Sequence, residues 1–64
     1  MTNEDREKLQ TIIDDFKIIE DKTFSDMDFL RNHGFEFEHF AVKLRYDAYH
    51  EIRIQLEMFR DKIL

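Results

Sequence analysis

The chain has 64 residues, a net charge of -5 and no cysteine. A chain of this length forms one small domain with a modest core, and without cysteine it has neither disulfides nor thiolate metal sites to hold that domain together. The acidic balance argues against sequence-independent binding to the phosphate backbone of nucleic acids, which needs a basic surface.

The first predicted element is a helix over about residues 3–22. Proline is absent and glycine occurs once, so the composition favours helix almost throughout the chain. Thr2 and Asp5 fit the capping box that begins a helix. One apolar face then recurs at steps of three and four residues: Leu9, Ile12, Ile13, Phe16 and Ile19.

A short second helix is predicted over residues 25–32. With Ser25 as its N-cap, Asp28 falls at the third helical position and completes a second capping pattern. Phe24 and Phe29 then occupy the two positions of a hydrophobic staple, in which one side chain packs on the other. These signals predict a kink or short loop in front of Ser25.

Gly34 is predicted to end this short helix. Glycine readily adopts the left-handed conformation that terminates many helices. With Gly34 in that conformation, Leu30 and Phe35 fall at the two positions that touch in a Schellman motif. The chain is therefore expected to turn here.

One unbroken helix over residues 3–32 is the alternative. It keeps Phe24 near the apolar face but places Phe29 on the same outer side as Ile18. We favour the break, at residues 22–25, because it gives Phe29 an apolar partner.

The last helix is predicted over residues 35–63. Its apolar stripe has helical spacing and is expected to form the core: Phe37, Ala41, Leu44, Ala48, Ile52, Phe59 and Ile63. Further apolar residues flank this stripe on both sides: Phe40, Ile54 and Met58, then Val42, Tyr46 and Tyr49. Only a narrow strip is expected to be fully solvated: Glu36, His39, Lys43, Asp47, His50, Glu57 and Asp61.

These elements predict a single all-α domain over residues 1–64, an antiparallel helical hairpin with a broken first arm. The last helix is apolar over more of its circumference than one neighbouring helix can cover. We therefore expect a homodimer, most simply a four-helix bundle. A docking site for a different protein is the alternative. The residues expected at the dimer or partner interface are Phe40, Tyr46, Tyr49, Ile54 and Met58.

No catalytic or cofactor-binding motif stands out, and we expect neither an enzyme, nor a metal, nor a cofactor. The two carboxylate-x-x-His pairs, Glu36 with His39 and Asp47 with His50, have the spacing of di-iron ligands. Because both pairs fall on the predicted solvated strip, we interpret them as surface residues. His33 is expected to interact with the negative end of the short helix. Glutamates after the glycine turn argue against a DNA-reading helix-turn-helix.

The predicted function is a small acidic regulator or inhibitor that docks on a larger protein. One alternative is imitation of nucleic-acid charge by an acidic face in the first arm: Asp14, Asp15, Glu20, Asp21, Asp26 and Asp28. Another, by architecture alone, is an RNA-binding helical hairpin of the Rop type. Small acidic regulators without cysteine are common on phages and plasmids, which is an association and not a physical argument. The sequence has no membrane-spanning run or signal peptide, so we expect a cytoplasmic protein.

Overall fold

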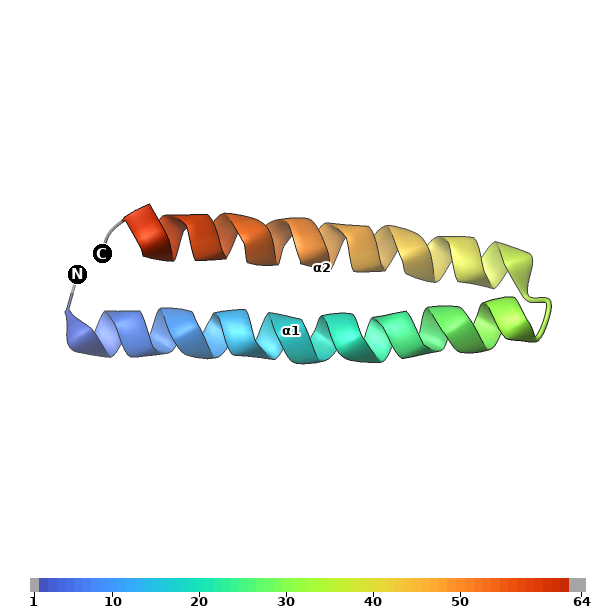
Figure 1. Ribbon diagram of the computed structural model, residues 1–64, viewed down its shortest axis with the longest axis horizontal. Coiled ribbons are helices and arrows are strands. Elements are labelled where there is room, and N and C mark those ends of the chain that lie inside the picture. Colours follow the sequence, from blue (N-terminus) through green and yellow to red (C-terminus); the bar gives the residue numbers. More distant parts are fainter. Residues whose placement is uncertain (1, 63–64) are drawn as a thin grey trace.

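The protein is an antiparallel pair of helices joined by one tight turn. The computed structural model describes residues 2–62, with helix α1 over Asn3–Asn32 and helix α2 over Glu36–Lys62. Figure 1 shows the helices side by side, with the start of α1 and the end of α2 at the same end of the molecule. The resulting rod measures 48 × 15 × 11 Å. The predicted all-α hairpin is thereby confirmed.

Helix α1 begins with the predicted capping box. The Thr2 hydroxyl accepts a hydrogen bond from the backbone N–H of Asp5 at 3.1 Å, and the Asp5 carboxylate accepts one from the backbone N–H of Thr2 at 3.4 Å. Both bonds satisfy amides that a helix start leaves without an intrahelical acceptor. Glu4 and Asp5 also place negative charge at the positive end of the helix dipole.

The predicted break at residues 22–25 is wrong, because α1 runs without interruption through Ser25. The Thr23 hydroxyl donates to the carbonyl of Ile19 at 2.7 Å, within the helix. Continuity also keeps Phe24 beside α2, where its ring lies 5.9 Å from that of Tyr46. A break would remove backbone hydrogen bonds and require a short helix to nucleate separately, and one N-cap cannot offset that cost.

In the unbroken helix, Phe29 is exposed on the outer side, as is Ile18. Its ring stacks on the imidazole of His33, with centroids 4.1 Å apart, and does not form a staple with Phe24. The His33 Nδ1–H donates to the carbonyl of Phe29 at 2.8 Å, so the histidine does bind the C-terminal end of a helix, as predicted.

The turn after α1 is the predicted Schellman motif. Gly34 has a φ of 77°, in the left-handed region that favours glycine. The N–H of Phe35 donates to the carbonyl of Leu30 at 2.9 Å, and that of Gly34 donates to the carbonyl of Arg31 at 3.2 Å. These are the two bonds that define the motif. The chain reverses within a few residues, so the two helices must pack on each other.

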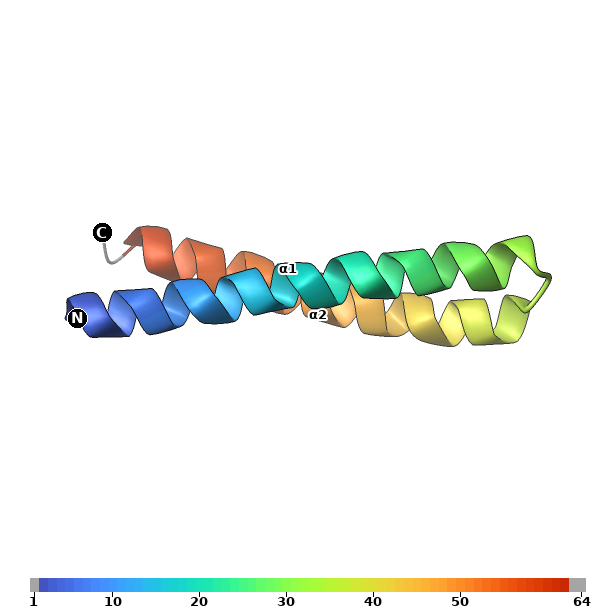
Figure 2. The ribbon, with the colours of Figure 1, turned by 90° about the horizontal axis from the view of Figure 1, so that it is seen from below.

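Packing between the helices is shallow. Among the described residues, the only buried apolar side chains are Leu9 and Ile13, both in α1. Closer to the middle of the rod, Phe16 packs on Tyr49 with ring centroids 6.1 Å apart. Figure 2 shows the helices crossing near their middle, which limits the length over which they touch closely. The hairpin by itself therefore has a very small core.

The apolar stripe predicted to form the core of α2 is not buried against α1, so this prediction is wrong. Its large members are exposed, and Phe37 has 82% of its surface in solvent. The side that meets α1 carries half-buried Val42, Tyr46 and Tyr49, which the sequence placed on a flank. Ile63, the last member of the stripe, lies outside the described residues. Residue contacts across the hairpin decide which side of α2 faces inward, and the period of the sequence does not encode them.

Neither of the two described helices contains a segment with the length and apolar character needed to span a membrane.

Candidate protein-interaction surfaces

The interior of the hairpin contains a charge cluster centred on Glu20, whose exposed fraction is only 5%. Its Oε1 atom accepts a hydrogen bond from His50 Nδ1 at 2.7 Å, and its Oε2 atom accepts one from Arg53 Nε. Arg53 also donates from Nη1 to Glu57 at 2.8 Å, and Lys17 lies 3.8 Å from the same carboxylate. All buried polar side-chain atoms of the described residues have partners. The cluster joins the two helices at mid-length.

Burial alone would raise the pKa of Glu20, but hydrogen bonds from Arg53 and His50, together with the charges of these groups, outweigh it. The pKa of Glu20 is therefore held below its ordinary value of 4.5. The hydrogen bond to Glu20 likewise raises the pKa of Arg53. Because the His50 Nδ1–H donates to Glu20, the 3.3 Å approach of Arg53 Nη2 to the same nitrogen is a contact between two donors and not a hydrogen bond.

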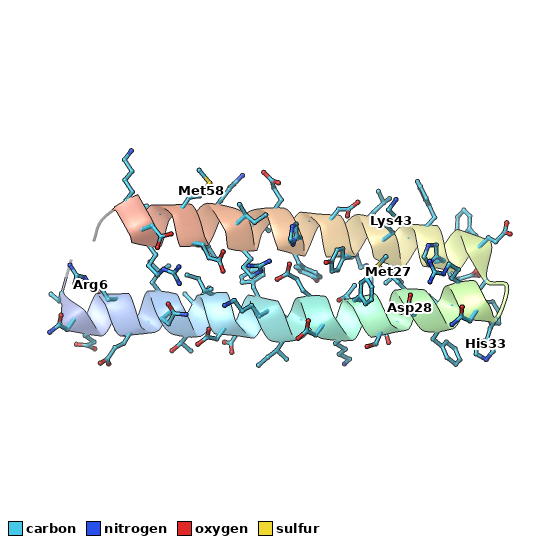
Figure 3. All side chains as sticks on the ribbon, in the orientation of Figure 1. Arg6, Met27, Asp28, His33, Lys43 and Met58 are labelled. Carbon is cyan, nitrogen blue, oxygen red and sulfur yellow. The ribbon has the colours of Figure 1, made fainter. Side chains whose placement is uncertain are left out.

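Both histidines of the predicted solvated strip lie between the helices, so this part of the prediction is wrong. His50 belongs to the charge cluster, and the His39 Nδ1–H donates to the carbonyl of Met27 at 3.0 Å. Figure 3 shows the Met27 side chain directed from α1 toward α2. Each histidine thus makes a hydrogen bond between the helices.

The side of α2 that faces away from α1 carries an apolar patch near the turn, which we call the outer edge. It consists of Phe37, Phe40 and Leu44, at spacings of three and four residues, and all three are exposed. Figure 3 shows Met58 directed away from α1 in the same manner, farther along the helix. The outer edge is continuous over two turns, unlike the single apolar side chains that any protein surface carries.

Acidic residues border the outer edge. Asp47 and Glu51 lie seven residues after Phe40 and Leu44, so they continue the same side of α2 toward its C-terminus. Glu36, four residues before Phe40, lies at the other end of the patch, and all three carboxylates are exposed. Lys43, next to Leu44 in the sequence, places one positive charge beside the patch. The outer edge is therefore an apolar surface with mainly negative flanks.

A second apolar surface spans both helices on one broad side of the rod. Ile19 of α1 and Tyr49 of α2 line one shallow groove with Thr23, Lys22 and Arg45. Residues seven positions apart share the same side of a helix. Ile12 lies seven residues before Ile19, and Ile52 and Phe59 lie seven and fourteen residues after Arg45, so all three belong to this side. We call this surface, consisting of Ile12, Ile19, Ile52 and Phe59, the isoleucine face. All four side chains are exposed, while Leu56 beside them is half-buried.

The five residues predicted at a dimer or partner interface do not lie on one surface. Phe40 and Met58 are exposed on the outer side of α2. Ile54 is half-buried, and Tyr46 and Tyr49 pack inside the hairpin against Phe24 and Phe16.

The predicted acidic face also divides into different environments. Asp14, Asp15, Asp21 and Asp26 are exposed. Asp28 is half-buried and pairs with Arg31 at 3.0 Å. Glu20 was wrongly assigned to this face, because it is buried between the helices. Sequence reasoning missed its partners His50 and Arg53, which lie 16 and 19 residues after Gly34, whereas Glu20 lies 14 residues before it.

Within residues 2–62, no three or more histidine, aspartate or glutamate side chains form a group suited to hold a metal ion. Glu36 and Asp47 point to solvent, whereas the histidines with which they were paired in the sequence bind other partners. His39 and His50 therefore serve contacts between the helices and are not paired with the carboxylates as metal ligands.

Comparison of the chain with protein-family models, with curated proteins and with solved structures gives no match.

Proposed function

We propose that the protein is a cytoplasmic, non-enzymatic interaction module that works as a homodimer and binds a larger protein through the outer edge. The observation that carries this proposal is the distribution of apolar side chains. The outer edge exposes Phe37, Phe40 and Leu44, whereas Leu9 and Ile13 are the only apolar side chains buried among the described residues. A contiguous exposed patch of large apolar residues is typical of a binding surface.

The chemistry of the outer edge favours an amphipathic partner with basic flanks. Two phenylalanines and a leucine on one side of a helix suit an apolar groove, in the mode by which amphipathic helices bind other proteins. Glu36, Asp47 and Glu51 surround this patch with negative charge. Lysine or arginine at the rim of the partner groove would complement these carboxylates and accelerate association at low salt.

Site-specific photo-crosslinking in the host cell tests this proposal. A benzoylphenylalanine residue replaces Phe40 in one variant and Ile18, an exposed apolar residue on the outer side of α1, in the control. The Phe40 variant is expected to give an adduct with one larger protein, and Asp47→Lys with Glu51→Lys is expected to abolish it. Equal crosslinking from both positions, or an adduct that survives the charge reversal, would contradict the proposal.

The same experiment distinguishes the two alternatives. A captured protein that binds nucleic acid and is displaced by DNA or RNA would support imitation of nucleic-acid charge. Recovery of RNA without protein would support a Rop-type function. The burial of Glu20 and the pairing of Asp28 with Arg31 take two of the six predicted acids out of a free acidic face, so we retain the protein-binding proposal.

A further inference from the structure

We propose that the isoleucine face is the surface on which a second copy of the chain packs, so that two hairpins form a four-helix bundle around their paired isoleucine faces. This inference deepens the homodimer part of the proposed function. It assigns the dimer contact to Ile12, Ile19, Ile52 and Phe59, a different surface from the outer edge that is assigned to the larger partner.

The small core of the hairpin is the first argument. A domain of this size needs disulfides, a metal or oligomerisation unless its helix packing is exceptionally good. The chain has no cysteine, and Leu9 and Ile13 are its only buried apolar side chains among residues 2–62. A second hairpin on the isoleucine face would bury four more large apolar residues from each copy and would cover half-buried Leu56. The apolar side chains at the centre of the bundle would then come from all four helices.

The shape of the face favours a partner of the same shape. Both helices contribute to it, so a single docked helix would cover only part of its width. The rod is 48 Å long and 15 Å wide, so one broad side presents roughly 700 Å². A contact along this whole side would therefore bury an area of the order of the roughly 800 Å² per partner of a standard stable interface. A second two-helix layer matches these dimensions along the whole rod.

Charge distinguishes a second copy from other occupants. Lys22, Asp26 and Arg45 line the groove on this side of the rod and offer both signs of charge. A two-fold contact brings identical surfaces together, so each copy must supply both members of every charge pair. The outer edge has mainly negative flanks, and two copies meeting there would repel each other. Self-association therefore suits the isoleucine face and not the outer edge.

Small and charged residues define the limits of the interface. Ala48, four residues before Ile52, and Ala41 share this side of α2 and extend it toward the turn with side chains that permit close approach. Lys17 and Asp21 line a groove with Glu20 and Arg53, on the side of α1 away from Ile19. The broad side opposite the isoleucine face is thus lined mainly by charged residues, so a third hairpin is not expected to pack there.

Sedimentation equilibrium of the purified chain tests the proposal directly. We expect twice the 8.0 kDa mass of one chain at micromolar concentration. Ile52→Glu is expected to abolish the dimer, whereas Ile18→Glu and Met58→Glu, at exposed apolar positions elsewhere, should retain it. A monomer throughout the concentration range, or dissociation by Met58→Glu and not by Ile52→Glu, would overturn the proposal.

Thiol labelling provides a readout that does not depend on a disruptive charge. The natural chain has no cysteine, so Ile52→Cys and Ile18→Cys each introduce a single thiol. The alkylation rate at position 52 should fall as protein concentration rises, while the rate at position 18 should stay constant. Equal rates at all concentrations would refute the isoleucine face as the dimer contact. The purified chain suffices here, so a failure would leave photo-crosslinking from Phe40 to a larger partner unaffected.

Discussion

Glu20 is the residue on which the pairing of the two helices most depends. Its carboxylate accepts hydrogen bonds from the His50 imidazole and the Arg53 guanidinium of α2, and it is almost fully buried. A buried ion pair stabilises little compared with apolar packing, but loss of one member leaves the other charge without its partner. The cluster therefore fixes the alignment of the helices more than it adds to their stability.

Glu20→Ala is expected to destabilise the protein by about 2–3 kcal/mol. This is less than the roughly 3–5 kcal/mol lost when a fully buried pair is broken, because Arg53 keeps its bond to Glu57. Urea unfolding followed by circular dichroism measures the change. Asp21→Ala, at the exposed neighbouring position, is the control and should change the free energy of unfolding by less than about 0.5 kcal/mol. Equal effects of the two substitutions would contradict the assigned role of Glu20.

The lowered pKa of Glu20 predicts a dependence of stability on pH. In the unfolded chain this carboxyl titrates near its ordinary pKa of 4.5, and in the folded protein it titrates lower. The contribution of Glu20 to the free energy of unfolding is thus complete above the pKa of the unfolded state. It is lost as pH falls through the lower pKa of the folded state. The free energy of unfolding should decrease below about pH 4.5 in the wild type. In Glu20→Gln, unfolding titrations should show a shallower decrease over the same range, and an identical slope would refute this account.

Gly34 provides a test of backbone conformation. Its φ of 77° is strained for an L-residue, although an added Cβ would meet no atom within 4 Å. Gly34→Ala should therefore cost about 1 kcal/mol through conformation alone. D-alanine at the same position, introduced by chemical synthesis, adopts this φ without strain and should stabilise the turn by about 0.4–1 kcal/mol. Thermal melts of both variants check the prediction, and destabilisation by D-alanine would indicate a steric conflict.

The sequence predicted correctly the helix ends that are determined by contacts between residues close together in the chain. Thr2 with Asp5 and Gly34 with Leu30 and Phe35 were correct because each motif is complete within six residues. Ser25 showed the same local pattern, but the helix continued through it. Contacts of Phe24 with Tyr46 and of Glu20 with Arg53, more than twenty residues apart in the sequence, favour the continuous helix.

The inward side of α2 could not be predicted for a related reason. Apolar spacing identified its stripes, yet it could not show which stripe meets α1 in a single chain. The structure places Val42, Tyr46 and Tyr49 inward and leaves Phe37 and Leu44 exposed. The predicted interface consequently combined Tyr46 and Tyr49 from inside the hairpin with the exposed residues Phe40 and Met58.

Ser25→Ala tests the continuity of α1. Within a helix, exposed serine is a poorer helix former than alanine, so the substitution should be neutral or stabilise the protein by up to about 0.5 kcal/mol. An N-cap at this position would instead make it destabilising by about 1 kcal/mol. Phe29→Ala should also have little effect, since Phe29 is exposed. Chemical denaturation of the two variants measures these changes. A clear loss of stability in both would contradict the continuous helix and support a break before Ser25.

If two hairpins pair through their isoleucine faces, folding and association are coupled. When the folded state is a dimer and the unfolded state is a monomer, raising the protein concentration favours the folded state by mass action. The midpoint of thermal unfolding should therefore rise with concentration in the wild type and in Ile18→Glu. In Ile52→Glu it should be lower and constant. Calorimetry over a range of concentrations measures this, and a constant wild-type midpoint would contradict the coupling.

The position of the two chain ends has a mechanical consequence. Residues at the start of α1 and the end of α2 lie at the same end of the rod, opposite the turn (Figure 1). A force pulling these ends apart would peel the helices away from each other in sequence, without sliding one along the other. It would first strain the bond from Arg60 to Gln10, at 2.9 Å, and the contacts of Leu9 and Ile13. Resistance would continue through the Glu20 cluster, then through the contact of Phe24 with Tyr46 and the hydrogen bond from His39 to Met27, before the force reached the turn at Gly34.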